Sequence, residues 1–408
     1  MSNGGEPGPR AADVLIAGAG LAGLTAAFGL ARAGFDVVSC GPAERSGRGR
    51  TVALLDPSAA FLKSLGLWTA LKSEAAPLRG LRLIDASAGL FPPSPVEFHA
   101  SEIGLAAFGW NIENDRMADA LSAAIARAPL IERIGAGVGA YEFGPDAVEA
   151  RLADGRAIKA SLAIGADGRL SKARRSAGLE ARLHRYPQRA LTALLAHRLP
   201  HNDFSTEFHT RSGPFTLVPL PASPAAENRS SLVWVMAEED AAKREGLDDE
   251  ALAHEIEREA HSLLGAMRLE GRRGFFPLAR QVVPTIAARR LALIGDAAHV
   301  LPPIGAQGLN LGLRDVEAIV SCATEARAEG RDIGGVETLH AYERSRRADI
   351  ALRTGLVDGL NRSLLAHFGA IDFVRGAALA ALSAVGPLRR FAMRTGIGPR
   401  PPRSMPRS

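Results

Sequence analysis

Residues 13–40 read DVLIAGAGLAGLTAAFGLARAGFDVVSC, and this stretch decides the fold that we expect. The apolar run at 13–17 is typical of a short buried strand, residues 21–33 favour a helix, and residues 36–40 favour a second strand. Between the first strand and the helix lies GAGLAG at 18–23, which has the form G-x-G-x-x-G. In a strand–helix–strand unit of about 30 residues, this motif predicts a dinucleotide-binding site.

Each glycine of this motif has its own physical role. Gly18 permits a tight turn, Gly20 lets the backbone approach a pyrophosphate, and Gly23 lets the helix pack closely on the strand. The N–H groups of Leu21 and Ala22 lie at the helix start, where the helix dipole favours phosphate. A glycine-rich turn that serves packing alone is the alternative interpretation.

The acid that usually holds a ribose is missing from its expected place. Dinucleotide folds commonly carry it at the end of the second strand, roughly 20 residues after the motif. This sequence has Gly41 there. Glu44 follows and is a candidate substitute, although a solvated loop glutamate is the more ordinary interpretation.

Two further motifs follow short buried strands later in the chain. Residues 165–168 read GADG after LAI, and residues 295–299 read GDAAH after LALI. Because ligands of open α/β sheets bind at the carboxyl ends of the strands, we expect both motifs to face the ligand. Asp296 is placed to accept hydrogen bonds from a ribose or ribityl chain. Asp167 has the same opportunity, although its segment could also be an ordinary turn.

The third motif leads into a long helix that we expect over 309–330. The loop GAQG at 305–308 directs its N–H groups along the start of this helix, an arrangement that stabilises negative charge on a ligand. His299 could serve as a catalytic base. We favour a structural hydrogen bond at the strand–loop corner instead.

Composition narrows the class of protein. A chain of 408 residues exceeds the usual size of a single core, so two domains are expected. The net charge is +5, but aromatic residues are only 5% and no basic run contains them, which argues against nucleic-acid binding. Cys40 and Cys322 are far apart and form no metal-ligand or disulfide pattern. The apolar stretch 14–31 approaches the length of a membrane span, but its glycines favour the nucleotide-binding interpretation.

We therefore expect an α/β fold with a discontinuous, Rossmann-like nucleotide-binding domain and a second, strand-rich substrate domain. The first would comprise residues 10–72, 106–182 and 276–345, and the second residues 73–105 and 183–275. Residues 346–396 are expected to be helical, and the Pro- and Arg-rich tail 397–408 to be disordered.

The three motifs, in this order, resemble those of the class A flavoprotein monooxygenases. GADGRLSKAR at 165–174 and GDAAHVLPPIGAQGLNLGLRDVEA at 295–318 are similar to that class over many consecutive positions. Within the class, residues 49–55, 310–315 and 354–361 resemble the hydroxylases of ubiquinone biosynthesis. The similarity runs from Asp13 to about Met393.

This resemblance implies FAD and NAD(P)H as cofactors and hydroxylation of an electron-rich aromatic ring with O2. The cofactor performs the difficult chemistry, so we expect neither a catalytic side-chain nucleophile nor a metal site. Two departures concern individual contacts. Ala306 stands where the family usually has Gly. Asp115 stands where the family has Arg, and Arg116 follows one position later. The candidate cofactor contacts are Gly18, Gly20, Leu21, Ala22, Gly23, Arg50, Arg116, Asp167, Gly168, Gly295, Asp296, Pro303, Gly305, Ala306, Gln307, Gly308, Leu309 and Asn310.

The resemblance also implies a polyprenylated phenol as substrate. Its pocket would lie under residues 190–237, with plain sheet core as the stronger interpretation of the apolar residues there, namely Phe215, Leu217, Val218, Trp234 and Val235. A cytoplasmic protein, in peripheral contact with the inner membrane through 364–395 or part of a biosynthetic complex, fits such a substrate. The alternatives are a hydroxylase of a small soluble aromatic compound and a flavin-binding subunit without catalysis.

Overall fold

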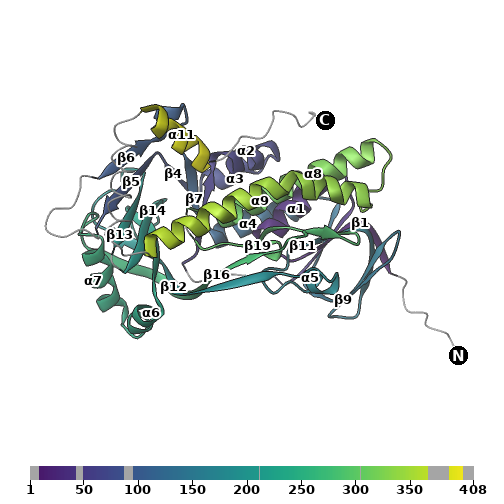
Figure 1. The fold of residues 1–408 in the computed structure, drawn as a ribbon, viewed down its shortest axis with the longest axis horizontal. Helices are drawn as coiled ribbons and strands as arrows, with labels where there is room; N and C mark the ends of the chain where they lie inside the picture. Colours follow the sequence, from purple (N-terminus) through teal and green to yellow (C-terminus); the bar gives the residue numbers. More distant parts are fainter. Residues whose placement is uncertain are drawn as a thin grey trace.

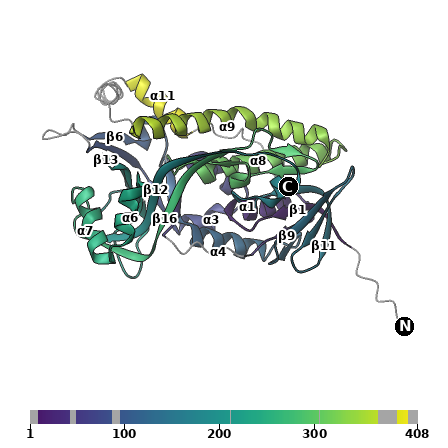
Figure 2. The same ribbon diagram turned by 60° about the horizontal axis from the view of Figure 1, so that its bottom comes forward.

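Two large sheets lie at opposite ends of an elongated molecule (Figure 1). The computed structural model describes residues 9–42, 49–86, 95–210, 212–303, 305–365 and 386–397. Strands β12 (Arg182–His197) and β16 (Met267–Val282) pair with each other and run between the two ends. At 16 residues each, they span about 50 Å. Helices α8 (Gln307–Ala328) and α9 (Val336–Leu365) pack side by side along the same direction (Figure 2).

The first sheet confirms the predicted nucleotide-binding topology. Its path of strands is β17 (Ala287–Ala288), β18 (Leu291–Leu293), β11 (Ala157–Gly165), β1 (Arg10–Ala17), β2 (Val37–Cys40) and β8 (Ile131–Ile134). From β18 to β8 the neighbours are parallel. The antiparallel hairpin of β9 (Val138–Phe143) and β10 (Val148–Leu152) extends β11.

Helix α1 (Leu21–Arg32) connects β1 to β2 and packs against α8 and α4 (Asn114–Ile125). Val14, Leu15 and Ile16 of β1 are fully buried, as is usual for a parallel strand covered on both faces. The apolar stretch 14–31 is therefore a strand and a helix of this domain, and its interpretation as a membrane span is wrong.

The second sheet forms the strand-rich part. In order, its strands are β19 (His299–Val300), β16, β12, β15 (Arg229–Ala237), β14 (Gly213–Leu220), β13 (Phe204–Thr210), β5 (Gly80–Asp85) and β6 (Val96–His99). Helices α6 (Glu238–Glu245) and α7 (Asp249–Glu259) cover one face of it. Leu252 and Ile256 of α7 are fully buried against the sheet because they stand four residues apart on one side of the helix.

A small third sheet lies beside the second sheet and against helices α4 and α8 of the first domain. It consists of β3 (Thr51–Leu55), β7 (Gly109–Glu113) and β4 (Ala75–Leu78). Strand β4 falls within the segment 73–105 that we expected in the substrate domain, yet it pairs with β7 instead. Helices α2 (Asp56–Ser64) and α3 (Trp68–Lys72) are separate, because Gly66 adopts a positive φ of 79° between them.

The C-terminal helices begin and end differently from the expectation. Helix α9 starts at Val336, ten residues before the expected helical region. A further helix, α11 (Gly386–Ile397), begins at the pair Gly386-Pro387. Most of the expected interfacial segment 364–395 and nearly all of the tail 397–408 lie outside the described residues. Within the described part, no helix is long and apolar enough to cross a membrane.

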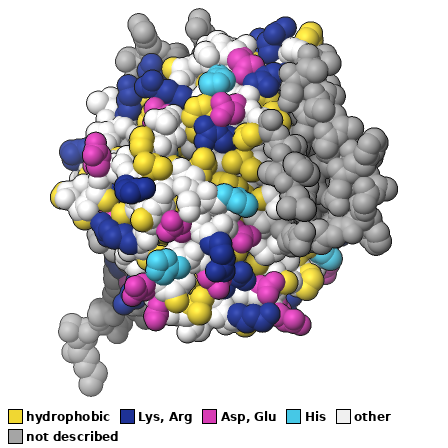
Figure 3. Space-filling model, turned by 90° about the vertical axis from the view of Figure 1, so that its left-hand side faces the viewer, with side chains coloured by type: hydrophobic (Ala, Val, Ile, Leu, Met, Phe, Trp, Pro, Cys, Tyr) yellow, Lys and Arg dark blue, Asp and Glu magenta, His cyan; other side chains and the backbone are white. Residues whose placement is uncertain are grey.

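The end of the molecule that carries the second sheet is mixed in character. Lysines and arginines, acidic residues and hydrophobic residues are interspersed over the described part of this face (Figure 3). A nucleic-acid platform would present basic side chains clustered on one face. The described part of this face therefore does not resemble one.

Candidate functional site

The three motifs meet at the carboxyl ends of adjacent parallel strands. The N–H of Ala166 donates to the carbonyl of Ala17 at 2.7 Å, so the second motif lies against the first. A Cβ added to Gly18 would lie 2.1 Å from the carbonyl oxygen of Ala166. Since Gly18 also has a φ of 122°, only glycine fits this turn.

The other two glycines of the first motif differ in the space around them. A Cβ on Gly23 would lie 2.1 Å from the carbonyl oxygen of Gly18, so this glycine permits the close contact of α1 with the turn. A Cβ on Gly20 would meet no atom within 4 Å. The space beside Gly20 is thus open, as a backbone that approaches a pyrophosphate requires.

Helix α1 starts without a side-chain cap and without an acid in its first turn. The first N–H groups of a helix have no partner within the helix, so those of Leu21, Ala22 and Gly23 are available to an anion. The open side of Gly20 and this uncapped start fit a bound diphosphate.

The third motif packs onto the same helix start. A Cβ on Gly295 would lie 3.4 Å from the Cβ of Ala22, and one on Gly312 of α8 would lie 3.2 Å from the Cα of Gly295. Asp296 is exposed between buried neighbours on both sides. Its carboxylate therefore lies at the surface of the site, which is compatible with the expected contact to a ribose or ribityl chain.

Asp167 of the second motif has a structural task. One of its carboxylate oxygens accepts from the N–H groups of Lys172 at 2.7 Å and Ala173 at 3.0 Å, and so caps helix α5 (Lys172–Ser176). Its other oxygen is buried without a hydrogen-bond partner among the described residues. That oxygen and the backbone at Gly168, whose φ is 77°, are what the motif offers to a ligand.

The loop before α8 is strained. Gly305 has a φ of 64°, and Ala306 has a φ of 54°, a region that costs about 1 kcal/mol or more for alanine. Ala306 is the N-cap of α8 and provides no side-chain cap. Successive left-handed residues at an uncapped helix start direct N–H groups outward and form an anion-binding concavity. Pro303 and Gly305 are exposed, as expected of residues that line a ligand.

The side chains of Gln307 and Asn310, which we expected to contact the cofactor, have hydrogen-bond partners within the protein. Asn310 is fully buried; its amide donates to the carbonyls of Ala53 at 2.8 Å and Ala306 at 2.6 Å, and its oxygen accepts from the N–H of Leu55 at 2.9 Å. The Gln307 amide donates to the carbonyl of Gly305 at 2.9 Å. Both side chains hold the loop, so the backbone of 307–309, including half-buried Gly308 and Leu309, is the part of the loop that stays a candidate contact to a flavin edge.

The two candidate arginines differ in position. Arg50 is exposed, and its guanidinium carbon lies 5.6 Å from the ring centroid of Phe276 on β16, so it lies between β3 and the second sheet. Arg116 is 62% exposed and pairs at 3.8 Å with Glu74. That partner follows α3, so Arg116 is directed toward α3; its contact to a cofactor stays a prediction.

A buried network explains His299. Its Nε2 lies 2.6 Å from Asp315, which also accepts from the N–H of Gly295 at 3.0 Å and from Arg346 at 2.8 Å. Burial alone would raise the pKa of Asp315, but the charges of His299 and Arg346 outweigh burial and hold that pKa below its ordinary value. The structural interpretation of His299 is the one that this geometry supports.

The missing acid at position 41 has a steric reason. Gly41 has a φ of 146°, and a Cβ there would lie 3.0 Å from the backbone N of Ala19 in the first motif. An acidic side chain would be both strained and crowded. Glu44, the candidate substitute, lies outside the described residues.

Tyr141 lies near the second motif, and the sequence did not suggest it as a site residue. Its hydroxyl is buried without a hydrogen-bond partner among the described residues. Burial, followed by the charge of Asp167, raises the pKa of Tyr141.

Sequence reasoning also missed Arg174. This buried residue donates to the carbonyl of Ala297 at 2.9 Å and to that of Arg169 at 3.0 Å, and so joins the second motif to the third. Its position inside the run 165–174 was visible, but nothing in the run indicates a partner more than 120 residues away.

The substrate-pocket candidates separate onto the two faces of the second sheet. Phe215, Leu217 and Trp234 are buried in the core under α6 and α7, which confirms the sheet-core interpretation. Val218 and Val235 alternate with them and project from the opposite face.

That opposite face is directed toward the third sheet. The hydroxyl of Ser231 on this face accepts from Thr51 at 2.9 Å and from Asn111 at 3.0 Å. Half-buried Thr192, Val233 and Thr216 form a row of directly paired residues on the same face.

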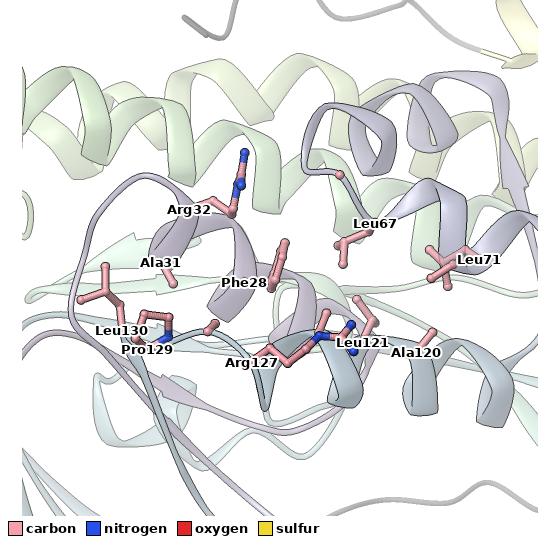
Figure 4. A pocket seen from close by; sticks show the side chains of 14 residues that line it. Phe28, Ala31, Arg32, Leu67, Leu71, Ala120, Leu121, Arg127, Pro129 and Leu130 are labelled. Carbon is pink, nitrogen blue, oxygen red and sulfur yellow. The ribbon is translucent and has the colours of Figure 1, made fainter. Parts of the chain in front are cut away.

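A cavity of about 480 Å³ lies elsewhere in the first domain (Figure 4). Phe28 and Arg32 from the C-terminal half of α1, Leu67 and Leu71, and Arg127 are among its lining residues. The motifs meet at the opposite end of α1, so this cavity is separate from the nucleotide site.

Comparisons with known proteins agree with this geometry. A family model described as an FAD binding domain matches residues 11–353. The chain is 33% identical to "Ubiquinone hydroxylase UbiL" of Rhodospirillum rubrum over 408 residues, covering 97% of this chain and 93% of that protein. It is 29% identical to "3-demethoxyubiquinol 3-hydroxylase" of Escherichia coli over 395 residues, covering 95% and 98%.

A solved structure supports the fold. The p-nitrophenol 4-monooxygenase PnpA of Pseudomonas putida superposes with a TM-score of 0.77 at 18% identity, covering 94% of this chain and 97% of that one. At this identity the likeness concerns the fold alone. Taken with the family model and the full-length relatives, it shows that this chain belongs to the family of FAD-dependent monooxygenases that includes the ubiquinone hydroxylases, and that it is a flavoprotein monooxygenase.

Proposed function

We propose that this protein hydroxylates the aromatic ring of a polyprenylated phenol in ubiquinone biosynthesis, with NAD(P)H as reductant and O2 as oxygen donor. The observation that carries the proposal is the match to a named ubiquinone hydroxylase over 97% of this chain. FAD supplies the redox and oxygen chemistry when it is bound. The residues of this chain bind the cofactor and the substrate, orient them and exclude water.

The first and third motifs would hold the two ends of FAD. The N–H groups of residues 21–23 and the open backbone at Gly20 are suited to the diphosphate, and the exposed carboxylate of Asp296 to a sugar hydroxyl. The N–H groups at the start of α8 are suited to the ring edge, where negative charge develops on reduction. Arg50, beside the second sheet, is suited to the flavin or to a phosphate of NAD(P)H.

The substrate would lie between the third sheet and the facing side of the second. Thr192, Val233 and Thr216 present a small, mainly apolar row there, next to Phe276 beneath Arg50. A ring bound on this row would be enclosed by protein on two sides. Such enclosure favours hydroxylation by keeping water away from the reacting centre.

A polyprenyl tail also suggests where the protein works. We propose a cytoplasmic protein that touches the inner membrane peripherally, alone or within a biosynthetic complex. Phe391 on α11 is 67% exposed, and Arg390 and Arg394 beside it are exposed, a combination that suits an anionic lipid surface.

The proposal is tested with purified, FAD-loaded protein, NAD(P)H and isotopically labelled O2. With a short-chain prenylated phenol we expect substrate-stimulated NAD(P)H oxidation and one labelled oxygen atom in the product, detected by mass spectrometry. Val233→Trp, which narrows the proposed cleft, should raise KM for this substrate. Leu247→Trp is the control, because Leu247 packs on the helix-covered core of the same sheet.

The other outcomes identify the alternatives. Turnover of unprenylated phenols alone would indicate a hydroxylase of small soluble compounds. Tight FAD binding without NAD(P)H oxidation in the presence of any phenol would indicate a non-catalytic subunit. Either result overturns the proposal.

A further inference from the structure

Helix α11 ends at a cluster of buried charges. The carbonyl of Gly396 accepts from Arg353 at 3.0 Å, and that of Ile397 accepts from Arg314 at 3.1 Å. These carbonyls belong to the last turn of α11, where a helix has acceptors without partners and the negative end of its dipole. The end of α11 is therefore suited to two cations.

The cluster contains three guanidinium groups, those of Arg314, Arg346 and Arg353. Asp349 accepts from Arg314 at 3.0 Å and from Arg346 at 2.9 Å, and it lies 3.6 Å from Arg353. Asp315 pairs with Arg346 from the other side, and the carboxyl group of Glu317 interacts with Arg314 and Arg346 without a direct ion pair. A buried cation without a partner is costly, so the carbonyl end of α11 contributes part of the compensation.

Arg353 connects this cluster to the strained loop. The side chain is 4% exposed, and its Nη1 lies 3.3 Å from the amide oxygen of Gln307. The same Gln307 side chain donates to the carbonyl of Gly305. A chain of contacts thus runs from the end of α11 through Arg353 and Gln307 to the left-handed residues at 305–306.

The other end of α11 is attached to the second sheet. Arg389 donates to both carboxylate oxygens of Glu102, at 2.6 and 2.7 Å, and its guanidinium carbon lies 4.5 Å from the ring centroid of Phe98. Phe98 belongs to the edge strand β6, and Glu102 to the short helix that follows it, η1 (Ala100–Ile103). Figure 1 shows α11 at this edge. Helix α11 therefore connects the edge of the second sheet to the loop 305–308.

We propose that Arg353 is a positioning residue for the loop 305–308 and that α11 holds Arg353 in place. This inference rests on the proposed binding of FAD at that loop. A left-handed alanine persists only where surrounding contacts fix it. Two contacts come from outside the loop 305–308: Asn310 donates to the carbonyl of Ala306, and Arg353 donates to the side chain of Gln307. Its buried positive charge also favours the more negative, reduced form of a flavin at this helix start.

The test compares variants of the full-length protein by the ratio of their affinities for reduced and oxidised FAD. This ratio is obtained from the midpoint potential of the bound flavin, where a tenfold change is about 30 mV for a two-electron couple. Arg353→Met should lower the ratio about tenfold, and Arg353→Lys, which keeps the charge, by less. Arg389→Met, at the far end of α11, should lower it about threefold.

Arg347→Met is the matched control, because Arg347 lies on the same helix and is 72% exposed. If Arg353→Met lowers the melting temperature but leaves the ratio at the control value, Arg353 is only structural and the inference is overturned. A normal ratio in Arg389→Met overturns the role of α11. If the wild-type protein binds no FAD, the proposed function itself fails; if it binds FAD and hydroxylates while the ratios do not change, only this inference fails.

Discussion

The two glycine-bearing loops of the site are held in place by opposite means. The first loop, 18–23, is determined by its own backbone: a Cβ added to Gly18 or Gly23 would lie 2.1 Å from a carbonyl oxygen, whereas one added to Gly20 would meet no atom within 4 Å. The loop at 305–308 contains an alanine in a strained conformation and is held by side chains of Asn310, Gln307 and Arg353. A local rule therefore explains the first loop, whereas the second depends on contacts between distant parts of the chain.

The largest effect should come from Gly18→Ala. The new Cβ would collide with the carbonyl of Ala166 and force a non-glycine residue to a φ of 122°. Overpacking and backbone strain together should lower the free energy of unfolding by about 4 kcal/mol. Urea unfolding of the apoprotein measures this, and FAD binding should be lost in parallel. A stable Gly18→Ala protein with normal FAD affinity would contradict our account of the first loop.

Asn310→Ala tests the second loop. The change leaves the carbonyls of Ala53 and Ala306 and the N–H of Leu55 without their buried partner. We expect the free energy of unfolding to fall by about 3 kcal/mol and FAD to bind more weakly. Ser321→Ala, at an exposed position later in the same helix, is the control for a change within α8. Equal stability of the two variants would mean that Asn310 does not hold the loop.

Gly20→Ala separates binding from folding. Since a Cβ at this position meets no protein atom within 4 Å, the apoprotein should keep its stability within about 0.5 kcal/mol. The methyl group would occupy space needed by the diphosphate, so the FAD dissociation constant should rise at least about tenfold, or 1.4 kcal/mol. Fluorescence titration with FAD gives the constant. Unchanged affinity would show that the diphosphate does not pass Gly20.

These predictions also mark how far the sequence alone leads. The roles of Gly18, Gly20 and Gly23 follow from spacing and from the strand and helix around them, because a turn is a local structure. The motif around Asn310 predicts a ligand contact for this residue. It carries no information about Leu55, the hydrogen-bond partner of Asn310 that lies 255 positions away. The alternation of side chains along a strand divides residues 215–218 between the two faces of the second sheet. It does not say which of these faces is directed toward the third sheet. The absence of an acid at position 41 can be seen in the sequence, but the steric reason for this absence can be seen only in the structure.

The smallest effect concerns the attachment of α11. The hydrogen bonds from Arg389 lower the pKa of Glu102 to about 2 from its ordinary 4.5. A carboxyl group with a lowered pKa stabilises the folded state above its ordinary pKa, and this contribution is lost as the pH falls from 4.5 toward 2. Hydrogen exchange in α11 should therefore accelerate, relative to the rest of the protein, over that pH range.

Glu102→Gln should accelerate the exchange of α11 already at neutral pH and remove most of its dependence between pH 4.5 and 2. Glu239→Gln, an exposed residue near the start of α6, is the control. The same acid dependence in wild-type and Glu102→Gln protein would show that this ion pair does not attach α11.

The most direct test of the central claim is the amount of flavin that the protein holds. If the bends at 18–23, 165–168 and 295–299 surround a single cofactor, titration of purified apoprotein with FAD should saturate at one FAD per chain. Saturation should produce a yellow protein, and Gly18→Ala should abolish it. Wild-type protein that stays colourless and takes up no FAD would contradict the whole account.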